Sequence, residues 1–79
     1  MNNNQKLTNS FSQALNISAN QISDDLTYQS IPEWDSITHM ILISQLEDDF
    51  GVSIETDDVI DMNSVAKAQE ILTKYGVAF

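Results

Sequence analysis

The chain has no cysteine and no arginine, and its 79 residues include only one proline and two glycines. Because no disulfide bond can form, a thin hydrophobic core must hold the fold, and the absence of thiols favours the reducing cytoplasm as its location. No apolar run of about 18 residues occurs, so we expect no membrane span. No apolar segment follows the first polar residues, so we also expect no secretion signal.

Positive charge is scarce, with three lysines against twelve aspartate and glutamate residues and a net charge of −9. Lysine and arginine are the residues that bind phosphate groups, so the sequence predicts neither nucleic acid nor an anionic membrane surface as a partner. A protein with a basic patch is the complementary partner. Acidic surfaces also keep small proteins soluble, so the charge alone does not identify a binding function.

Residues that could form a catalytic or metal site are nearly absent. His39 is the single histidine, and a metal site with nitrogen or sulfur ligands would need further histidines or cysteines. The acidic run 57–61 lacks the ligand spacing and the glycine of an EF-hand loop, and no glycine-rich phosphate loop occurs. We therefore expect neither an enzyme nor a metal-binding protein, and we expect His39 to be packed and hydrogen-bonded.

Apolar residues recur three or four positions apart in several segments, which is typical of amphipathic helices. The predicted helices cover about residues 4–16, 36–50, 57–61 with Thr56 as its cap, and 64–75. We expect Val59, Ile60 and Met62 to anchor the short third helix in the core. Residues 17–35 form a long connection, in which we expect a short helical turn near 20–26 and scattered apolar residues that pin it to the core. The sequence thus predicts a single domain over residues 1–79, an all-α small four-helix bundle with three main helices and a short third one.

The helix predicted over 36–50 has clear start and stop signals. Asp35 can act as its N-cap, and Gly51 can take the left-handed conformation that ends a helix. Ser36 holds the first helical position, where its hydroxyl points outward. The amino end of a helix favours negative charge, so a phosphate ester on Ser36 would be stabilised there. Most Asp-Ser pairs at helix starts are only caps, so the pattern leaves both interpretations open.

A helical wheel at about 100° per residue divides the apolar residues of this helix into two sets. The residues predicted to face the core are Leu42, Ile43, Leu46 and Phe50, with His39 among them. The second set consists of Ile37, Met40 and Ile41, which we call the docking patch, and Ser36 lies at the boundary between the two sets. An exposed apolar patch marks a contact site. A four-helix bundle could also bury both sets between its helices, and the spacing does not decide between these alternatives.

Motifs along the chain resemble those of the acyl carrier protein family. Residues 34–37 read Trp-Asp-Ser-Ile, where the family has Asp-Ser-Leu. Residues 46–52 read Leu-Glu-Asp-Asp-Phe-Gly-Val, where the family has Leu-Glu-x-x-Phe-Gly-Ile, and Ile54 matches the isoleucine that follows. Together with the length and the acidity, the resemblance covers essentially the whole chain.

The resemblance implies a four-helix bundle with a short third helix and a carrier function without catalysis. It implies that Ser36 receives 4′-phosphopantetheine as a phosphodiester from coenzyme A through a phosphopantetheinyl transferase. The thiol of this arm would carry an acyl group as a thioester, so the cofactor supplies the thiol that the chain lacks. The implied partners are acyl- or aminoacyl-activating and acyl-transferring enzymes with basic docking patches, and we expect the carrier to be a monomer.

The resemblance also implies roles for residues near Ser36. Asp35 would lie beside the arm and contact the transferase, while Ile37 and Met40 of the docking patch would make the apolar partner contact. Glu47 and Asp48 would present negative charge to basic partner enzymes. An acyl chain would shelter in the core among Leu42, Ile43, Leu46, Ile54, Met62 and Ala68.

Four residues depart from the pattern of carriers in fatty acid synthesis, of which Ile37 in place of the usual leucine is a mild change in shape. Those carriers usually have a small residue at the position of Trp34 and acids at the positions of Thr38 and Ile41, so the docking helix is less negative here and more apolar. The chain is more similar to discrete carriers of specialised pathways, such as polyketide, modified-lipid or surface-glycan assembly. The alternatives are a stand-alone aminoacyl carrier and an unmodified acidic helical adaptor that binds a basic protein through the docking patch.

Overall fold

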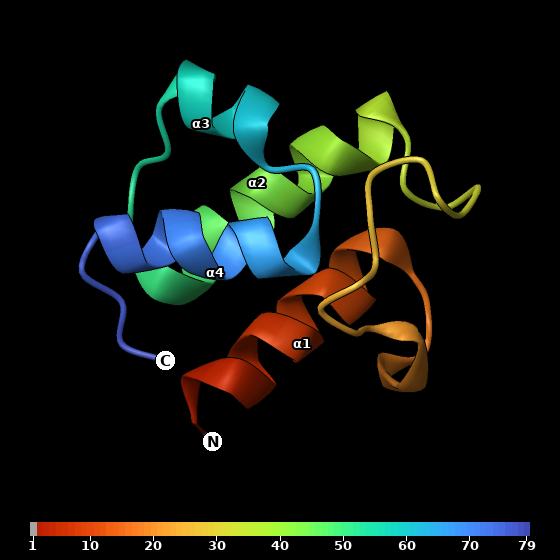
Figure 1. The fold of residues 1–79 in the computed structure, drawn as a ribbon, viewed down its shortest axis with the longest axis horizontal. Coiled ribbons are helices and arrows are strands. Elements are labelled where there is room, and N and C mark those ends of the chain that lie inside the picture. Colours follow the sequence, from red (N-terminus) through yellow and green to blue (C-terminus); the bar gives the residue numbers. More distant parts are fainter. Residues whose placement is uncertain (1) are drawn as a thin grey trace.

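The computed structural model describes residues 2–79, and within that range the chain folds into four α-helices and no strand. The elements are α1 (Asn3–Leu15), the 3-10 turn η1 (Ala19–Gln21), α2 (Ser36–Phe50), α3 (Thr56–Asp61) and α4 (Val65–Lys74). Figure 1 shows α1 and α3 on opposite sides of the molecule, with α2 and α4 between them. The predicted bundle of three main helices and one short helix is confirmed. None of the helices in the described part of the chain is both long and apolar enough to cross a membrane.

The ends of the long helices follow the predicted start and stop signals. Asp35 caps the start of α2, and Gly51 at its end has a φ of 65°, in the left-handed region that suits glycine. Gly76 follows α4 with a φ of 96°. The Val77 amide then closes the turn on the Leu72 carbonyl at 3.0 Å, which is the backbone bond of a Schellman motif.

The short helix α3 differs from the prediction in two respects. Its N-cap is Glu55, whereas Thr56 is the first helical residue, and no side chain caps the amides of this end. Ile60, expected to anchor the helix in the core, is 73% exposed, whereas Met62 is completely buried. Adjacent residues of a helix point about 100° apart, and in α3 it is Val59 rather than Ile60 that packs against the core.

The buried residues of α1, α2 and α4 meet in one core. Its helical members are Leu7, Phe11, Ala14 and Leu15 of α1, Leu42, Ile43 and Leu46 of α2, and Val65, Ala68, Ile71 and Leu72 of α4. This confirms the predicted core face of α2, with Phe50 partly buried at its end. Trp34, from the loop before α2, is the largest fully buried side chain and packs edge-on against Phe11.

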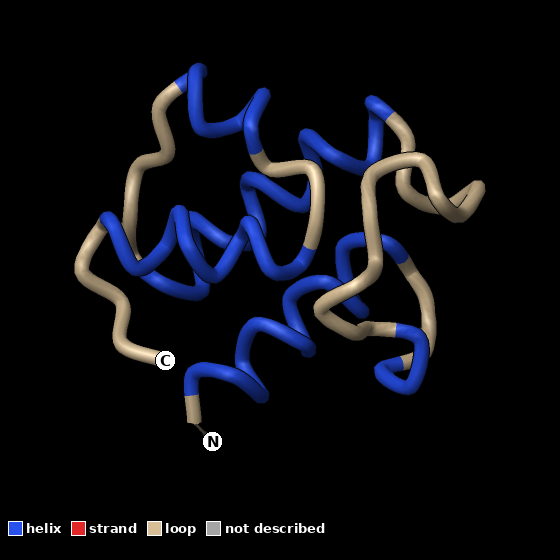
Figure 2. The backbone as a smooth tube through the Cα atoms, viewed as in Figure 1, coloured by secondary structure: helices blue, strands red, loops and turns tan. Residues whose placement is uncertain are grey.

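The long connection 17–35 is pinned to the core, as the sequence predicts. Figure 2 shows it as a loop with η1 near its start, and this turn begins and ends earlier than the predicted 20–26. Leu26 is buried in the core. The Tyr28 amide donates a hydrogen bond to the Asn63 carbonyl at 2.9 Å, which ties the loop to the connection between α3 and α4.

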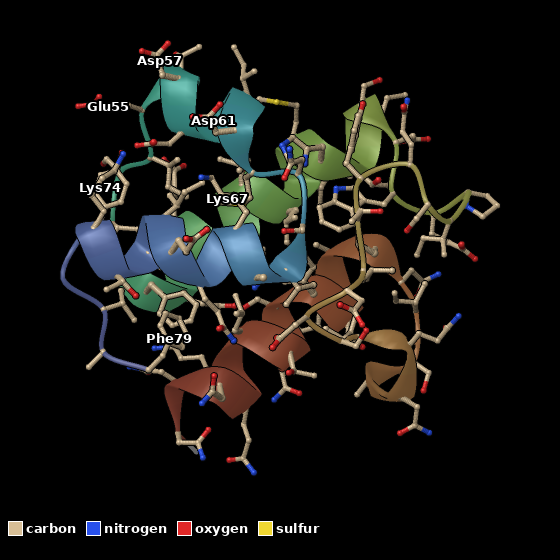
Figure 3. All side chains as sticks on the ribbon, viewed as in Figure 1. Glu55, Asp57, Asp61, Lys67, Lys74 and Phe79 are labelled. Atoms are coloured by element: carbon tan, nitrogen blue, oxygen red, sulfur yellow. The ribbon has the colours of Figure 1, made fainter. Side chains whose placement is uncertain are left out.

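Asp58 fastens α3 to α4. Its carboxylate is buried and accepts hydrogen bonds from Lys74 Nζ at 2.5 Å and from the Tyr75 hydroxyl at 2.6 Å. The Glu55 amide donates to the same Tyr75 hydroxyl at 3.0 Å. Figure 3 shows Lys74 reaching from the end of α4 towards α3. The Lys74 hydrogen bond, followed by that of Tyr75, lowers the pKa of Asp58, so the carboxylate is charged and paired at neutral pH.

Candidate functional site

Ser36 begins α2 with an exposed side chain. The preceding residue, Asp35, is the N-cap, and its Oδ1 atom accepts hydrogen bonds from the amides of Ile37 at 3.0 Å and Thr38 at 2.9 Å. Within residues 2–79 the Ser36 hydroxyl has no hydrogen-bond partner. Asp35 therefore does the capping, and Ser36 stands available at the positive end of the helix.

Thr38 completes a capping box that the sequence analysis did not predict. The Asp35 amide donates to Thr38 Oγ1 at 2.9 Å, and the Thr38 hydroxyl donates to the Glu33 carbonyl at 2.6 Å. The Thr38 amide contributes most to lowering the pKa of Asp35, so a charged carboxylate lies next to Ser36. The sequence pattern that could have predicted this capping box is Asp-x-x-Thr, in which threonine takes the place of the usual glutamate or glutamine.

The docking patch is exposed, which excludes the alternative that both apolar faces of α2 are buried. Ile37, Met40 and Ile41 expose 71%, 57% and 49% of their surface. Ile60 of α3 is also exposed, and it lines one pocket together with Met40, so the apolar surface continues from α2 onto α3. The spacing of apolar residues did not predict this extension, because it depends on how α3 packs beside α2.

A pocket of about 310 Å³ opens directly beside Ser36, between α2, α3 and the loop before α2. Its lining residues are Tyr28, Ser36, His39, Met40, Val59, Ile60, Met62 and Asn63. Of the residues expected to shelter an acyl chain, only Met62 is among them. Leu42, Leu46 and Ala68 are completely buried in the core, as predicted, and their role in sheltering an acyl chain stays a prediction. The space near Ser36 therefore lies under α3 rather than deep inside the bundle.

Two comparisons with known proteins bear on this site. Residues 5–68 match the family described as "Phosphopantetheine attachment site". The chain is also similar to the acyl carrier protein of Lactobacillus johnsonii, with 31% identity over 70 residues that cover 89% of this chain and 88% of the relative. The chain belongs to the acyl carrier protein family. It is thus a carrier protein and not an enzyme, its cofactor is covalently attached 4′-phosphopantetheine, and it works with a phosphopantetheinyl transferase and partner enzymes.

The local geometry suits this cofactor. An arm attached at the exposed hydroxyl of Ser36 would displace no existing hydrogen bond of that group. Its phosphodiester would lie at the amino end of α2, where the helix dipole favours negative charge. The pocket beside Ser36 offers mainly apolar side chains to whatever the arm carries.

His39 is packed and hydrogen-bonded in this carrier, as predicted. Trp34 Nε1 donates a hydrogen bond to His39 Nδ1 at 3.0 Å, and His39 Nε2 lies 2.8 Å from the Val59 carbonyl oxygen. Both ring nitrogens are therefore engaged in holding structure. No group of three or more potential metal-ligating side chains occurs within the described residues.

Glu47 and Asp48 lie about three turns along α2 from Ser36. Asp48 is exposed, whereas one oxygen of Glu47 accepts a hydrogen bond from the Ile54 amide at 2.8 Å. Glu47 thus helps to hold the connection between α2 and α3 as well as carrying charge. The role of both residues in partner docking stays a prediction.

Proposed function

We propose that the chain is a discrete acyl carrier, in which Ser36 Oγ bears the 4′-phosphopantetheine arm. Residues 1–79 act as one monomeric domain in the cytoplasm and deliver thioesters to enzymes of a lipid, polyketide or other specialised pathway. The observation that carries the proposal is the position of Ser36. Its hydroxyl is exposed at the start of α2 and has no partner among residues 2–79, and it lies between the docking patch and a mostly apolar pocket.

Attachment is a phosphoryl transfer in which the transferase supplies the catalysis. A bond forms between Ser36 Oγ and the phosphorus that carries pantetheine, and the hydroxyl proton passes to the transferase. The pyrophosphate bond of coenzyme A breaks, and adenosine 3′,5′-bisphosphate departs as the leaving group. The N-cap carboxylate of Asp35 is directed at the amides of Ile37 and Thr38. The charge of Asp35 is therefore offset by the helix, which leaves the amino end of α2 able to accommodate the phosphodiester. Asp35 remains close enough in the chain to contact the transferase.

The distribution of charge around Ser36 supports a specialised pathway. The surface of α2 from Ser36 to Ser44 carries no acid, because Thr38 and Ile41 stand where carriers of fatty acid synthesis have acids. Three exposed acids lie instead on α3 or directly before it, namely Glu55, Asp57 and Asp61, which Figure 3 labels. A fitting partner enzyme contacts the docking patch with apolar side chains and places its basic groups opposite α3, Glu47 and Asp48.

Intact-mass measurement tests the attachment site. The chain is coexpressed with a phosphopantetheinyl transferase, and we expect a mass increase of one phosphopantetheine. Ser36→Ala should abolish the increase, whereas Ser44→Ala, an exposed serine on the same helix, should retain it. An adduct on the Ser36→Ala protein would refute the assignment.

Loading experiments distinguish the carried group. Acyl- and aminoacyl-activating enzymes are tested with the phosphopantetheinylated protein, and the apolar lining of the pocket favours acyl loading. Loading by the aminoacyl enzymes alone would establish an aminoacyl carrier. A stable complex with a basic protein that is unaffected by Ser36→Ala, without any adduct on the natural chain, would establish the unmodified adaptor.

A further inference from the structure

Two adjacent residues of the short helix α3, Asp58 and Val59, make hydrogen bonds that hold it to α4 and α2. Asp58 binds α4 through Lys74 and Tyr75, while the carbonyl of Val59 meets His39 of α2. In a longer helix the Asn63 amide would donate to the Val59 carbonyl. Here α3 ends at Asp61 and the Asn63 amide donates to the Asp61 carbonyl at 2.8 Å, so the Val59 carbonyl has no partner within the helix. His39 therefore acts as a side-chain cap for the carboxyl end of α3.

The two partners of His39 determine its tautomer. The indole nitrogen of Trp34 can only donate a hydrogen bond, so His39 Nδ1 must be the acceptor and carry no hydrogen. The ring hydrogen then lies on Nε2, which donates to the Val59 carbonyl at 2.8 Å. A single neutral tautomer thus satisfies both contacts. Trp34 is fully buried, so its indole N–H would be left unpaired without this ring.

The imidazole joins three segments that surround the pocket. It lies on α2, binds α3 through Val59, and binds the loop before α2 through Trp34. Its ring also packs against Tyr28 of that loop, with 5.3 Å between the ring centres. Tyr28, His39 and Val59 all line the pocket beside Ser36, so the ring contacts two other residues of the pocket wall.

We propose that His39, as the neutral tautomer with its hydrogen on Nε2, is a positioning residue that holds α3 and the loop against α2 and thereby shapes the pocket beside Ser36. The arrangement is a property of the unmodified chain. Its consequence, that this pocket shields a thioester carried on Ser36, rests on the proposed function. Both ring nitrogens of His39 are engaged by Trp34 and Val59, so the residue acts by holding these partners and not as an acid or base.

Three substitutions separate the two contacts in the unmodified protein. His39→Phe keeps an aromatic ring and removes both hydrogen bonds. His39→Asn keeps an acceptor at the position of Nδ1 for Trp34 but does not reach Val59. His39→Gln keeps a donor at the position of Nε2 for the Val59 carbonyl and loses the acceptor for Trp34.

Amide hydrogen exchange at Met62, the C-cap of α3, measures the effect of losing the hydrogen bond between residue 39 and the Val59 carbonyl. Met62, whose amide donates to the Asp58 carbonyl, is followed relative to Phe11 of α1. We expect the Phe and Asn variants to exchange Met62 about two- to tenfold faster relative to Phe11, because one net hydrogen bond is lost, and the Gln variant to match the natural protein. Unchanged relative exchange in the Phe and Asn variants, or equal acceleration in all three, would overturn the proposal.

Trp34 is the single tryptophan, so its emission reads out the other contact independently. The emission should shift more in the Phe and Gln variants, which lose the acceptor for the indole N–H, than in the Asn variant, which keeps that acceptor and loses only the ring stacked on Trp34. This crossed pattern cannot arise from a general loss of stability, which would move both signals together. A shift in the Asn variant as large as that in the Phe variant would refute the assigned tautomer.

The consequence for the carried group is tested on the phosphopantetheinylated protein loaded with a hexanoyl thioester. Cleavage by hydroxylamine should be about two- to tenfold faster in the Phe and Asn variants than in the Gln variant. Equal cleavage rates would show that the ring does not shield the thioester. If Ser36 accepts no arm at all, the proposed function fails, while exchange and emission in the unmodified protein still decide the role of His39.

Discussion

One hydroxyl group, that of Thr38, joins the N-cap of α2 to the turn before it. It accepts from the Asp35 amide and donates to the Glu33 carbonyl, so it holds the backbone on both sides of the Asp-Ser pair. Thr38→Val keeps the shape of the side chain and removes both hydrogen bonds. We expect the free energy of unfolding to fall by about 1 kcal/mol, as measured by urea denaturation.

Thr38→Ser is the matched control, because it retains the hydroxyl and loses only a methyl group. It should stay close to the natural protein in stability. If the Val and Ser variants have the same urea midpoint, the Thr38 hydroxyl does not stabilise the start of α2.

The residues around Ser36 show which features could be predicted from the local sequence alone. Asp35 was identifiable because N-capping depends on local chemistry, namely a short acceptor before the first helical turn. The contact between His39 and Val59 was not, because it joins residues 20 positions apart whose separation depends on the packing of α3. The sequence did predict that His39 is packed, but it could not identify the two partners.

At the scale of elements, the exposed apolar surface extends from the docking patch on α2 to Ile60 of α3. Ile37→Ser should raise the KM of the phosphopantetheinyl transferase by about tenfold, because an apolar contact at an interface centre is lost. The free energy of unfolding should change by no more than about 0.5 kcal/mol, because the side chain is exposed. Ser44→Ala, on the same helix outside the patch, should leave the KM unchanged, and an unchanged KM for Ile37→Ser would exclude this residue from docking.

The helices themselves were largely predictable, whereas the pocket was not. Start and stop signals such as Asp35 and Gly51 lie within a few residues of the helix ends that they determine. The pocket needs α2, α3 and the loop before α2 together, and its walls come from positions as distant as Tyr28 and Asn63. The residues predicted to line the core are indeed buried there, with the exception of the partly buried Ile54, whereas their role in sheltering an acyl chain stays a prediction.

The Asp58 anchor between α3 and α4 predicts a particular pH dependence. Because the pKa of Asp58 is lowered in the folded state, its contribution to stability is present above the unfolded value of about 3.9 and is lost as the pH falls through the folded value. The pKa of Lys74 is raised, so its contribution is present below about 10.4 and is lost as the pH rises through the folded value. The anchor therefore stabilises the fold throughout the neutral range.

Asp58→Asn tests this anchor through melting temperatures measured from pH 3 to pH 8. The variant should melt below the natural protein at pH 5 to 8, and the difference should shrink as the pH falls below about 4. Asp57→Asn is the control, because this neighbour on α3 is exposed. A difference between Asp58→Asn and the natural protein that persists at pH 3 would show that the charge of Asp58 is not what fastens α3.

At the scale of the whole molecule, the net charge of −9 must be accommodated on a body with a radius of gyration of 11.1 Å. Repulsion among the acids opposes the compact state and is screened by salt, with a screening length of about 30 Å at 0.01 M and about 3 Å at 1 M ionic strength. We expect the melting temperature to rise with sodium chloride over this range. The effect should come from the summed charge, because no cluster of three or more metal-ligating side chains occurs among residues 2–79.

Two exposed neighbours in the loop before α2, Asp24 and Asp25, allow this expectation to be tested away from the site. Neutralising both, in Asp24→Asn/Asp25→Asn, changes the net charge from −9 to −7 and removes an adjacent pair of like charges. The variant should melt higher than the natural protein at low salt and converge with it at high salt. Ser23→Asp, which adds a third adjacent acid, should shift the low-salt melting temperature in the opposite direction. Salt curves that run parallel in all three proteins would mean that charge repulsion in this loop does not weaken the fold.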